Sequence, residues 1–191
     1  MIARIVFTGN INLPAENMIV TAFYEAVTHA QQNNYRLNHI DFFISSWGGS
    51  VDCGISIYNQ LKTIPYPIHC YNIATIESIA LPIFMVGEMR FSSRLSKFMT
   101  HEYLWPASEL NNVTIVTCKN LEERLALDQD RVKKIFIERG VKDNNWNEIF
   151  PHGERYHSPD WAKSLGIIHD IKEAPTYPPT ETVFWRTLYS N

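Results

Sequence analysis

Three features at the ends of predicted strands have the residue types of a site for nucleophilic catalysis. Ser78 starts a predicted buried helix, where unpaired backbone N–H groups and the helix dipole favour a developing negative charge. His101 ends an apolar strand and can accept a proton near neutral pH. Gly48 and Gly49 follow another strand, and glycines let backbone N–H groups turn toward a ligand, as an oxyanion hole requires. Each feature alone is more often structural, but their joint order favours a serine nucleophile.

The other reactive side chains have structural interpretations that we prefer. Lys97 lies on the strand before His101 and could pair with a serine, but its four-residue offset from the histidine favours an outward-facing ion pair. A His-x-Glu-x-x-His motif at 152–157 gives no helical i, i+4 pair of histidines, and Gly153 and Pro159 favour a loop there. We therefore predict no metal ligands and no cofactor.

Strand and helix patterns alternate three times in the first half of the chain. Period-2 and buried runs predict strands, and apolar residues three and four apart predict helices. The predicted strands cover 3–8, 39–45 and 68–75, and the predicted helices cover 14–33, 51–64 and 78–86. Such alternation predicts an α/β layered fold with a largely parallel sheet, whose reactive residues lie where strands end and helices begin.

The second half has weaker patterns. Residues 90–105 predict one or two short strands ending near His101, and an amphipathic helix follows over 121–139. Ser158 is a predicted N-cap for a helix through Leu165, and a strand follows over 167–171. From residue 174 the chain has three prolines and no clear period. We therefore predict one domain over 1–173 and a C-terminal tail over 174–191.

Composition describes an ordinary globular chain. Its 191 residues are 45% hydrophobic and 19% charged, with a formal net charge of −3 and mixed signs, which excludes the basic field of a nucleic-acid binder. Cys53, Cys70 and Cys118 are an odd set without CxxC spacing, which argues against a disulfide framework or a zinc site and favours a reducing cytoplasm. No apolar run is long enough to span a bilayer, so we expect no membrane anchor.

Four segments together resemble the Clp protease proteolytic subunit family. They are RIVFTGNI at 4–11, FISSWGGSVDCGISIYNQLKTI at 43–64, IATIESIALPIFMVGE at 73–88 and RFSSRLSKFMTHEY at 90–103. The interval from Gly49 to Ser78 has the family spacing, whereas the interval from Ser78 to His101 is two residues shorter. The resemblance covers about 3–103 and 154–171. It implies a layered Clp/crotonase-like fold of repeated β-β-α/βαβ units with a protruding helical handle.

The resemblance also implies a serine peptidase mechanism. Ser78 would attack the scissile carbonyl, and His101 would take and return the proton. The backbone N–H groups of Gly49 and Ile79 would hold the oxyanion. Aligning ERYHSPDWAKSLGII on its glycine places Glu154 where the family usually has an aspartate, so Glu154 is the predicted third catalytic residue.

Two further acidic residues bear on this assignment: Asp160 is an alternative third catalytic residue, and Glu77 departs from the family pattern. Asp160 is the nearest substitute for Glu154, although its position favours the first turn of a helix. Glu77 stands beside the nucleophile where the family has a small residue, and could cap the helix or repel the oxyanion.

Three functions remain open. The preferred one is a cytoplasmic serine peptidase that cleaves peptides or unfolded proteins within a homo-oligomeric ring. The second is a catalytically impaired structural or regulatory ring subunit, and the third is an acyl-CoA-binding crotonase-like enzyme, which would not need Ser78 and His101. The chain begins directly on its first predicted strand, without the axial loop that meets an ATP-dependent unfoldase in this family. The resemblance implies an unfoldase partner, but the missing loop argues against one.

Overall fold

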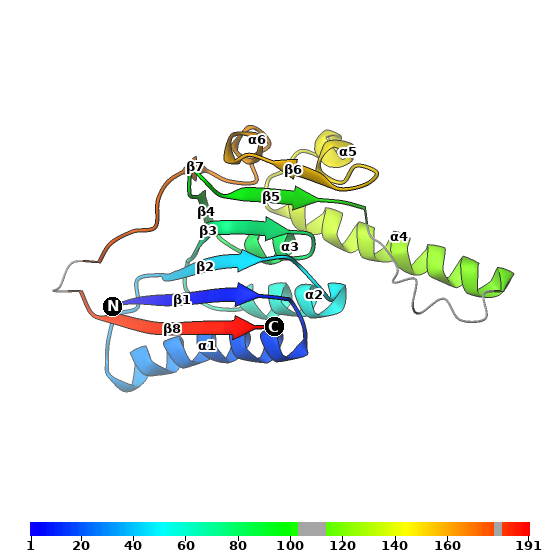
Figure 1. Cartoon of the computed structure of the whole chain (residues 1–191). Coiled ribbons are helices and arrows are strands. Elements are labelled where there is room, and N and C mark those ends of the chain that lie inside the picture. The colour runs from blue at the N-terminus through cyan, green and yellow to red at the C-terminus, as the bar shows by residue number, and fades with distance from the viewer. Residues whose placement is uncertain (103–113, 178–180) are drawn as a thin grey trace.

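A single mostly parallel sheet organises the computed structural model (Figure 1). The structure describes residues 1–102, 114–177 and 181–191, and within them eight strands form this sheet. Strand neighbours follow the order β6-β5-β3-β2-β1-β8, while β4 pairs with β3 and β7. Among these pairs only β5 and β6 are antiparallel. The strands are β1 (Ile2–Gly9), β2 (Ile40–Ser46), β3 (Ile68–Glu77), β4 (Met89–Ser92), β5 (Lys97–Thr100), β6 (Arg155–His157), β7 (Asp170–Ile171) and β8 (Val183–Ser190).

Helices connect the parallel strands, as right-handed crossover units require. They are α1 (Leu13–Gln32), α2 (Val51–Leu61), α3 (Ala80–Phe84), α4 (Ile115–Glu138), α5 (Trp146–Ile149) and α6 (Pro159–Ser164), with a 3₁₀ turn at Asp143–Asn145. Side-chain caps fix several starts: Asn12 accepts from the N–H of Ala15 at 2.9 Å, and Ser50 accepts from the N–H of Cys53 at 3.4 Å.

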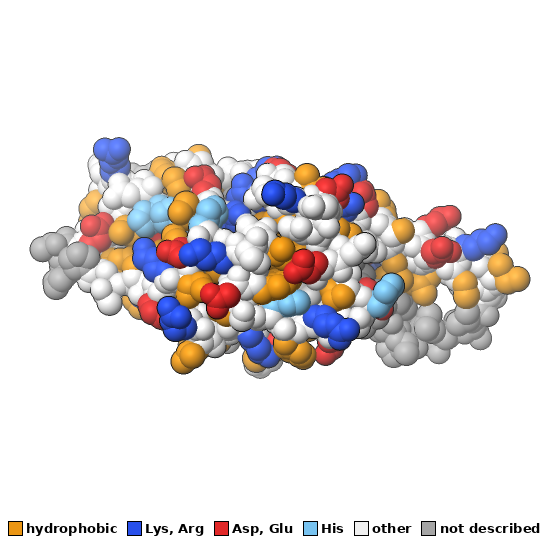
Figure 2. All heavy atoms as spheres, turned by 90° about the horizontal axis from the view of Figure 1, so that it is seen from above, with side chains coloured by type: hydrophobic (Ala, Val, Ile, Leu, Met, Phe, Trp, Pro, Cys, Tyr) orange, Lys and Arg blue, Asp and Glu red, His pale blue; other side chains and the backbone are white. Residues whose placement is uncertain are grey.

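The main core lies between one sheet face and the helices α1, α2 and α3. Alternate residues of β1, namely Ala3, Ile5 and Phe7, are fully buried against that layer. The opposite face carries a smaller cluster of stacked rings from Phe43 and Tyr71, with centroids 4.8 Å apart. Figure 2 shows acidic and basic side chains interspersed on the face seen from above, without a single-sign field. None of the described helices has both the length and the apolar character needed to cross a membrane.

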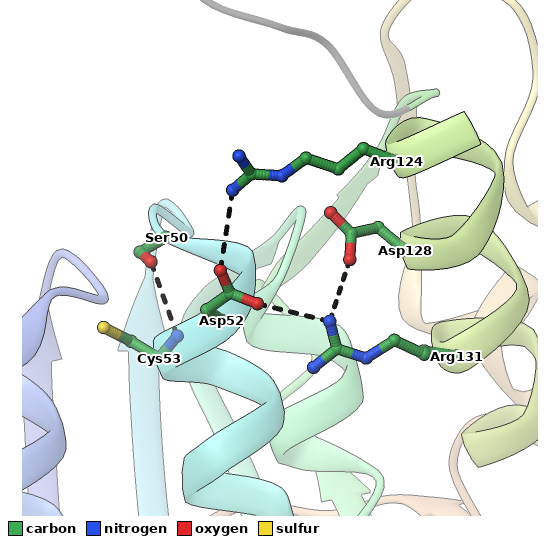
Figure 3. A network of polar contacts seen from close by, with 6 residues as sticks. All are labelled: Ser50, Asp52, Cys53, Arg124, Asp128 and Arg131. Atoms are coloured by element: carbon green, nitrogen blue, oxygen red, sulfur yellow. Dashed lines mark hydrogen bonds and ion pairs between the residues drawn. The ribbon is translucent and has the colours of Figure 1, made fainter. Parts of the chain in front are cut away.

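The long helix α4 extends beyond the ends of the strands, and its C-terminal half is anchored to the body (Figure 1). Val132, Ile135 and Phe136 are buried in the main core. Figure 3 shows a polar anchor at the start of α2, where Asp52 contacts Arg131 at 3.2 Å and Arg124 at 3.6 Å. These pairs are largely exposed, so they orient α4 more than they stabilise the fold.

The structure confirms the predicted α/β layered fold and corrects several details. The helix predicted over 78–86 is α3, which is shorter, because Ser78 and Ile79 form a turn. The helix predicted over 121–139 begins six residues earlier, at Ile115, where Thr114 caps it. Residues 103–105 of the segment predicted to hold short strands lie outside the described residues.

Two strands were missing from the sequence predictions. β6 has three residues in the segment interpreted as a loop, and β8 lies in the predicted tail, paired with β1 along its whole length. Neither strand has a usable pattern, because β6 is too short and β8 lies at a sheet edge with both faces partly exposed. The division of the chain at residue 173 stays a prediction.

Candidate active site

Three neighbouring parallel strands end at the same sheet edge, and the candidate residues follow directly after them. Ser46 of β2 is in register with Ile76 of β3, and Glu77 of β3 is in register with Met99 of β5. Gly48 and Gly49 therefore follow β2, Ser78 follows β3, and His101 follows β5. Carboxyl ends of parallel strands are the usual position for binding and catalytic groups in α/β folds.

The backbone of Ser78 is left-handed, with a φ of 52°. Its N–H donates to the carbonyl of Met99 at 3.0 Å, and its own carbonyl accepts from the N–H of Leu81 at 3.0 Å. A non-glycine residue in this region is strained, and a sharp turn from strand to helix projects a serine hydroxyl away from the backbone. The local chain thus presents Ser78 Oγ at the sheet edge.

The hydroxyl of Ser78 contacts the imidazole of His101. Ser78 Oγ lies 2.8 Å from His101 Nε2, and both residues are half-buried. On the other side of the ring, His101 Nδ1 closely contacts the backbone carbonyl of Glu102. Because a carbonyl only accepts, this contact favours the tautomer with a proton on Nδ1, which leaves Nε2 free to accept the serine proton. The pair therefore has the geometry of a nucleophile and its general base.

Glycine is required at positions 48 and 49, which follow β2 and Trp47. A Cβ on Gly48, whose φ is 89°, would lie 2.8 Å from Ser78 Cβ, and a Cβ on Gly49 would lie 2.2 Å from the carbonyl oxygen of Ile11. Within the part of the chain that the structure describes, the N–H groups of Gly49 and Ile79 donate to no protein acceptor. No described protein acceptor would therefore compete with an oxyanion for these two N–H groups.

The acid beside the nucleophile is paired rather than free. Glu77 is 6% exposed, and its carboxylate accepts from Thr75 Oγ1 at 2.7 Å and contacts Lys97 Nζ at 3.0 Å. Lys97 Nζ also lies 4.8 Å from the ring centroid of Tyr156. Lys97 therefore makes the predicted outward-facing ion pair, and its charge compensates Glu77 close to the site. Glu77 ends β3 and does not cap α3.

The predicted third residue does not contact the histidine. Thr100 is in register with Arg155 across the antiparallel pair, so Glu154 lies one step beyond, beside His101. Its carboxylate, however, accepts from the hydroxyl of Tyr156 at 3.3 Å, and this carboxylate raises the pKa of Tyr156. Among the described residues no hydrogen bond or ion pair joins Glu154 to His101.

The remaining candidates have the structural roles that their positions suggest. Asp160 lies in the first turn of α6, whose N-cap is Ser158. His152 Nδ1 contacts a carboxylate oxygen of Glu102 at 2.8 Å, whereas His157 Nε2 contacts Thr100 Oγ1 at 2.9 Å. Burial lowers the pKa of His157, which favours its neutral form. His152 and His157 thus contact different residues.

Sequence reasoning missed the groups that hold the serine and histidine in place. Gly48 touches Ser78, the Met99 carbonyl fixes its N–H, and the Glu102 carbonyl holds the histidine ring. Gly54 of α2 similarly makes room for Ile79, because a Cβ there would lie 2.3 Å from Ile79 Cγ1. Neither these glycine contacts nor the backbone carbonyls leave a distinctive pattern in the local sequence.

Comparisons with known proteins identify the family and the fold. The sequence profile of the family described as Clp protease matches residues 3–174. The "ATP-dependent Clp protease proteolytic subunit" of Chara vulgaris is 27% identical over 150 residues, which are 76% of this chain and 66% of that protein. The chain thus spans slightly less than two thirds of this curated relative. A ClpP1 mutant from Listeria monocytogenes matches with a TM-score of 0.74 and 18% identity, over 90% of this chain and 91% of the other. At this identity the match establishes the fold.

Replacing Gly48 with alanine tests the packing beneath the serine. The new Cβ would push on Ser78 Cβ and on the carbonyl of Glu77, 2.9 Å away. Because displacements of about 1 Å can cost on the order of 100-fold in rate, we expect fluorophosphonate labelling of Gly48→Ala to slow by roughly that factor. Labelling rates in the intact protein measure the effect.

Gly140→Ala is the matched control. Gly140 has a φ of 92° and nothing within 4 Å of its ideal Cβ, so the variant has similar backbone strain without a clash. We expect it to be labelled at the wild-type rate. Equal rates for the two variants would contradict the packing role of Gly48.

Proposed function

Because the chain belongs to the Clp protease family, we propose that it hydrolyses peptide bonds with Ser78 as nucleophile and His101 as general base. The observation that carries this proposal is the 2.8 Å contact between Ser78 Oγ and His101 Nε2. The left-handed backbone of Ser78, which projects the hydroxyl at the sheet edge, supports the same assignment.

The reaction divides into two halves with the same groups. His101 Nε2 takes the hydroxyl proton as Ser78 Oγ attacks the scissile carbonyl, and the N–H groups of Gly49 and Ile79 hold the resulting oxyanion. Collapse breaks the C–N bond, and the proton passes from His101 to the leaving amine. Water then loses a proton to His101 and attacks the acyl-enzyme, which releases the acid product and restores the serine.

Glu154 is the proposed orienting residue for His101 in the reacting state. Its place beside His101, one residue beyond the Thr100 and Arg155 pair, supports this role. To act, its carboxylate must leave the Tyr156 hydroxyl and reach His101 Nδ1, which now contacts the Glu102 carbonyl. Until then the carbonyl itself maintains the productive tautomer.

A groove beside the histidine supports a peptide substrate. It has a volume of about 460 Å³ and lies between α4 and the segment after β5. Its lining includes Glu102 next to His101 and the half-buried side chains of Leu121 and Leu125. Apolar side chains of a peptide laid along this groove would contact Leu121 and Leu125 of α4.

Exposed apolar residues on α4 support assembly into a homo-oligomeric ring. Ile115, Val116 and Leu127 are 78%, 65% and 59% exposed on a helix that extends beyond the sheet. Apolar side chains gathered on a protruding helix are typical of a surface that another subunit covers. Ring assembly would also enclose the site and limit access to peptides and unfolded polypeptides.

A catalytically impaired ring subunit is the second candidate function. The observations that favour it are the buried carboxylate of Glu77 beside the nucleophile and the contact of Glu154 with Tyr156 instead of His101. A negative charge near the oxyanion would raise the barrier to acylation if it were not compensated.

Covalent labelling tests the preferred function. We expect a fluorophosphonate to modify wild-type protein at one serine and to leave Ser78→Ala unlabelled. Peptide hydrolysis by Ser78→Ala and by His101→Ala should fall by at least about 10³-fold, as expected on losing either partner of such a pair. Ser164→Ala, which alters an exposed serine of α6, is the control and should retain both activities. Labelling that persists in Ser78→Ala would rule out this nucleophile.

A double-mutant cycle on Glu77 and Lys97 separates the two functions. Lys97→Met leaves the Glu77 carboxylate without its counter-charge, so labelling should slow about tenfold, or about 1.4 kcal/mol of barrier. Glu77→Gln keeps the size of the side chain, and we expect it to change the rate little by itself and to restore the rate when combined with Lys97→Met. A large gain in turnover for Glu77→Gln alone would instead favour the impaired subunit.

A further inference from the structure

A second cluster of reactive side chains lies at the sheet edge opposite the serine and histidine. His39 precedes β2, Asp41 is in β2, and His69 is in β3 in register with Asp41. One potential ligand atom from each residue lies within 4.8 Å of the other two. The parallel strands begin here, whereas Ser78 and His101 follow strand ends. We propose that these three residues bind one divalent transition-metal ion of the zinc type.

The distances within the cluster fit metal coordination better than hydrogen bonding. Asp41 Oδ1 lies 3.4 Å from His39 Nε2 and 3.6 Å from His69 Nδ1. These separations are longer than normal hydrogen bonds between nitrogen and oxygen. Ligands about 2.0–2.1 Å from a tetrahedral zinc ion lie roughly 3.4 Å from one another, so the cluster has the dimensions of a metal site.

The buried carboxylate has one oxygen that is still unsatisfied. Asp41 is 1% exposed; its Oδ2 accepts from the hydroxyl of Tyr177 at 2.7 Å, but its Oδ1 has no hydrogen-bond partner. Asp41 Oδ1 is therefore a buried oxygen that faces two imidazole nitrogens, an arrangement that a cation would satisfy.

The surroundings allow an ion to enter and keep the ligands in place. The side chains of His39 and His69 are 23% and 25% exposed, and their rings are stacked with centroids 4.3 Å apart. Water can therefore supply the fourth ligand. The hydroxyl of Tyr177 donates to the other oxygen of the Asp41 carboxylate. Such a hydrogen bond from a residue that does not touch the metal commonly orients a metal ligand.

The types of the ligands determine which ion is suitable. Arg4 is in register with Asp41, and its guanidinium lies 4.3 Å from the ring centroid of Phe43 and 4.1 Å from that of Trp185. Its charge opposes all divalent cations alike and does not select among them. Two imidazole ligands select zinc and similar metals over magnesium and calcium. The bound ion would fasten the starts of β2 and β3 and, through Tyr177, the segment before β8.

Metal titration of the chelator-treated full chain tests this site independently of peptidase activity. We expect one equivalent of Co²⁺ to give the strong visible absorption of a tetrahedral site, and one equivalent of Zn²⁺ to displace it. Tyr177→Phe should weaken zinc binding about tenfold, because it removes only the outer support. His39→Gln and His69→Gln should each weaken it further and abolish the cobalt bands.

His152→Gln is the matched control, because it removes an exposed histidine that also contacts a carboxylate. It should bind zinc as tightly as the wild type. Circular dichroism verifies that each variant is folded, and the partly exposed His39 is less critical for folding than Asp41. The proposal is wrong if the wild type binds no stoichiometric metal, if His39→Gln and His69→Gln bind it unchanged, or if His152→Gln weakens it equally.

Discussion

The left-handed turn at Ser78 is the constraint on which the site depends. β3 ends at Glu77, and the chain turns sharply at the next residue, Ser78. The turn must be tight because the carbonyl of Ser78 already accepts a hydrogen bond from the N–H of Leu81. Gly48 lies directly against this turn, so only a residue without a Cβ can follow β2 there. The strain of a non-glycine residue at φ 52° is held by the surrounding sheet and core, which fixes Ser78 Oγ relative to His101 before any substrate binds.

The charges nearest to this turn are the side chains of Glu77 and Lys97, and they matter more there than the dipole of α3. α3 has only five residues, so its helix dipole is weak. The neighbouring Glu77 carries a negative charge, and Lys97 is held against it from the next strand. β3 and β5 therefore bring together Ser78, His101 and the ion pair that neutralises Glu77.

The sequence predicts where β1, β2 and β3 end, because alternating apolar runs mark these strands. It also predicts Ser78 and His101 as site residues, because the order from Gly49 to Ser78 to His101 is distinctive. The contact of Glu154 with Tyr156 was not predictable, since the rotamer of an exposed side chain leaves no pattern in the sequence. β6 and β8 depend on pairing with β5 and β1, which local sequence does not encode. His39 and His69 are likewise 30 residues apart and meet only through strand register.

A crystal structure of the fluorophosphonate adduct would locate the reactive groups directly. We expect a covalent bond from Ser78 Oγ to phosphorus and a phosphonyl oxygen about 2.7–3.1 Å from the N–H groups of Gly49 and Ile79. We also expect the Glu154 carboxylate at His101 Nδ1, in place of the Glu102 carbonyl. An adduct on another residue, or a phosphonyl oxygen turned away from both N–H groups, would contradict the assignment of this site.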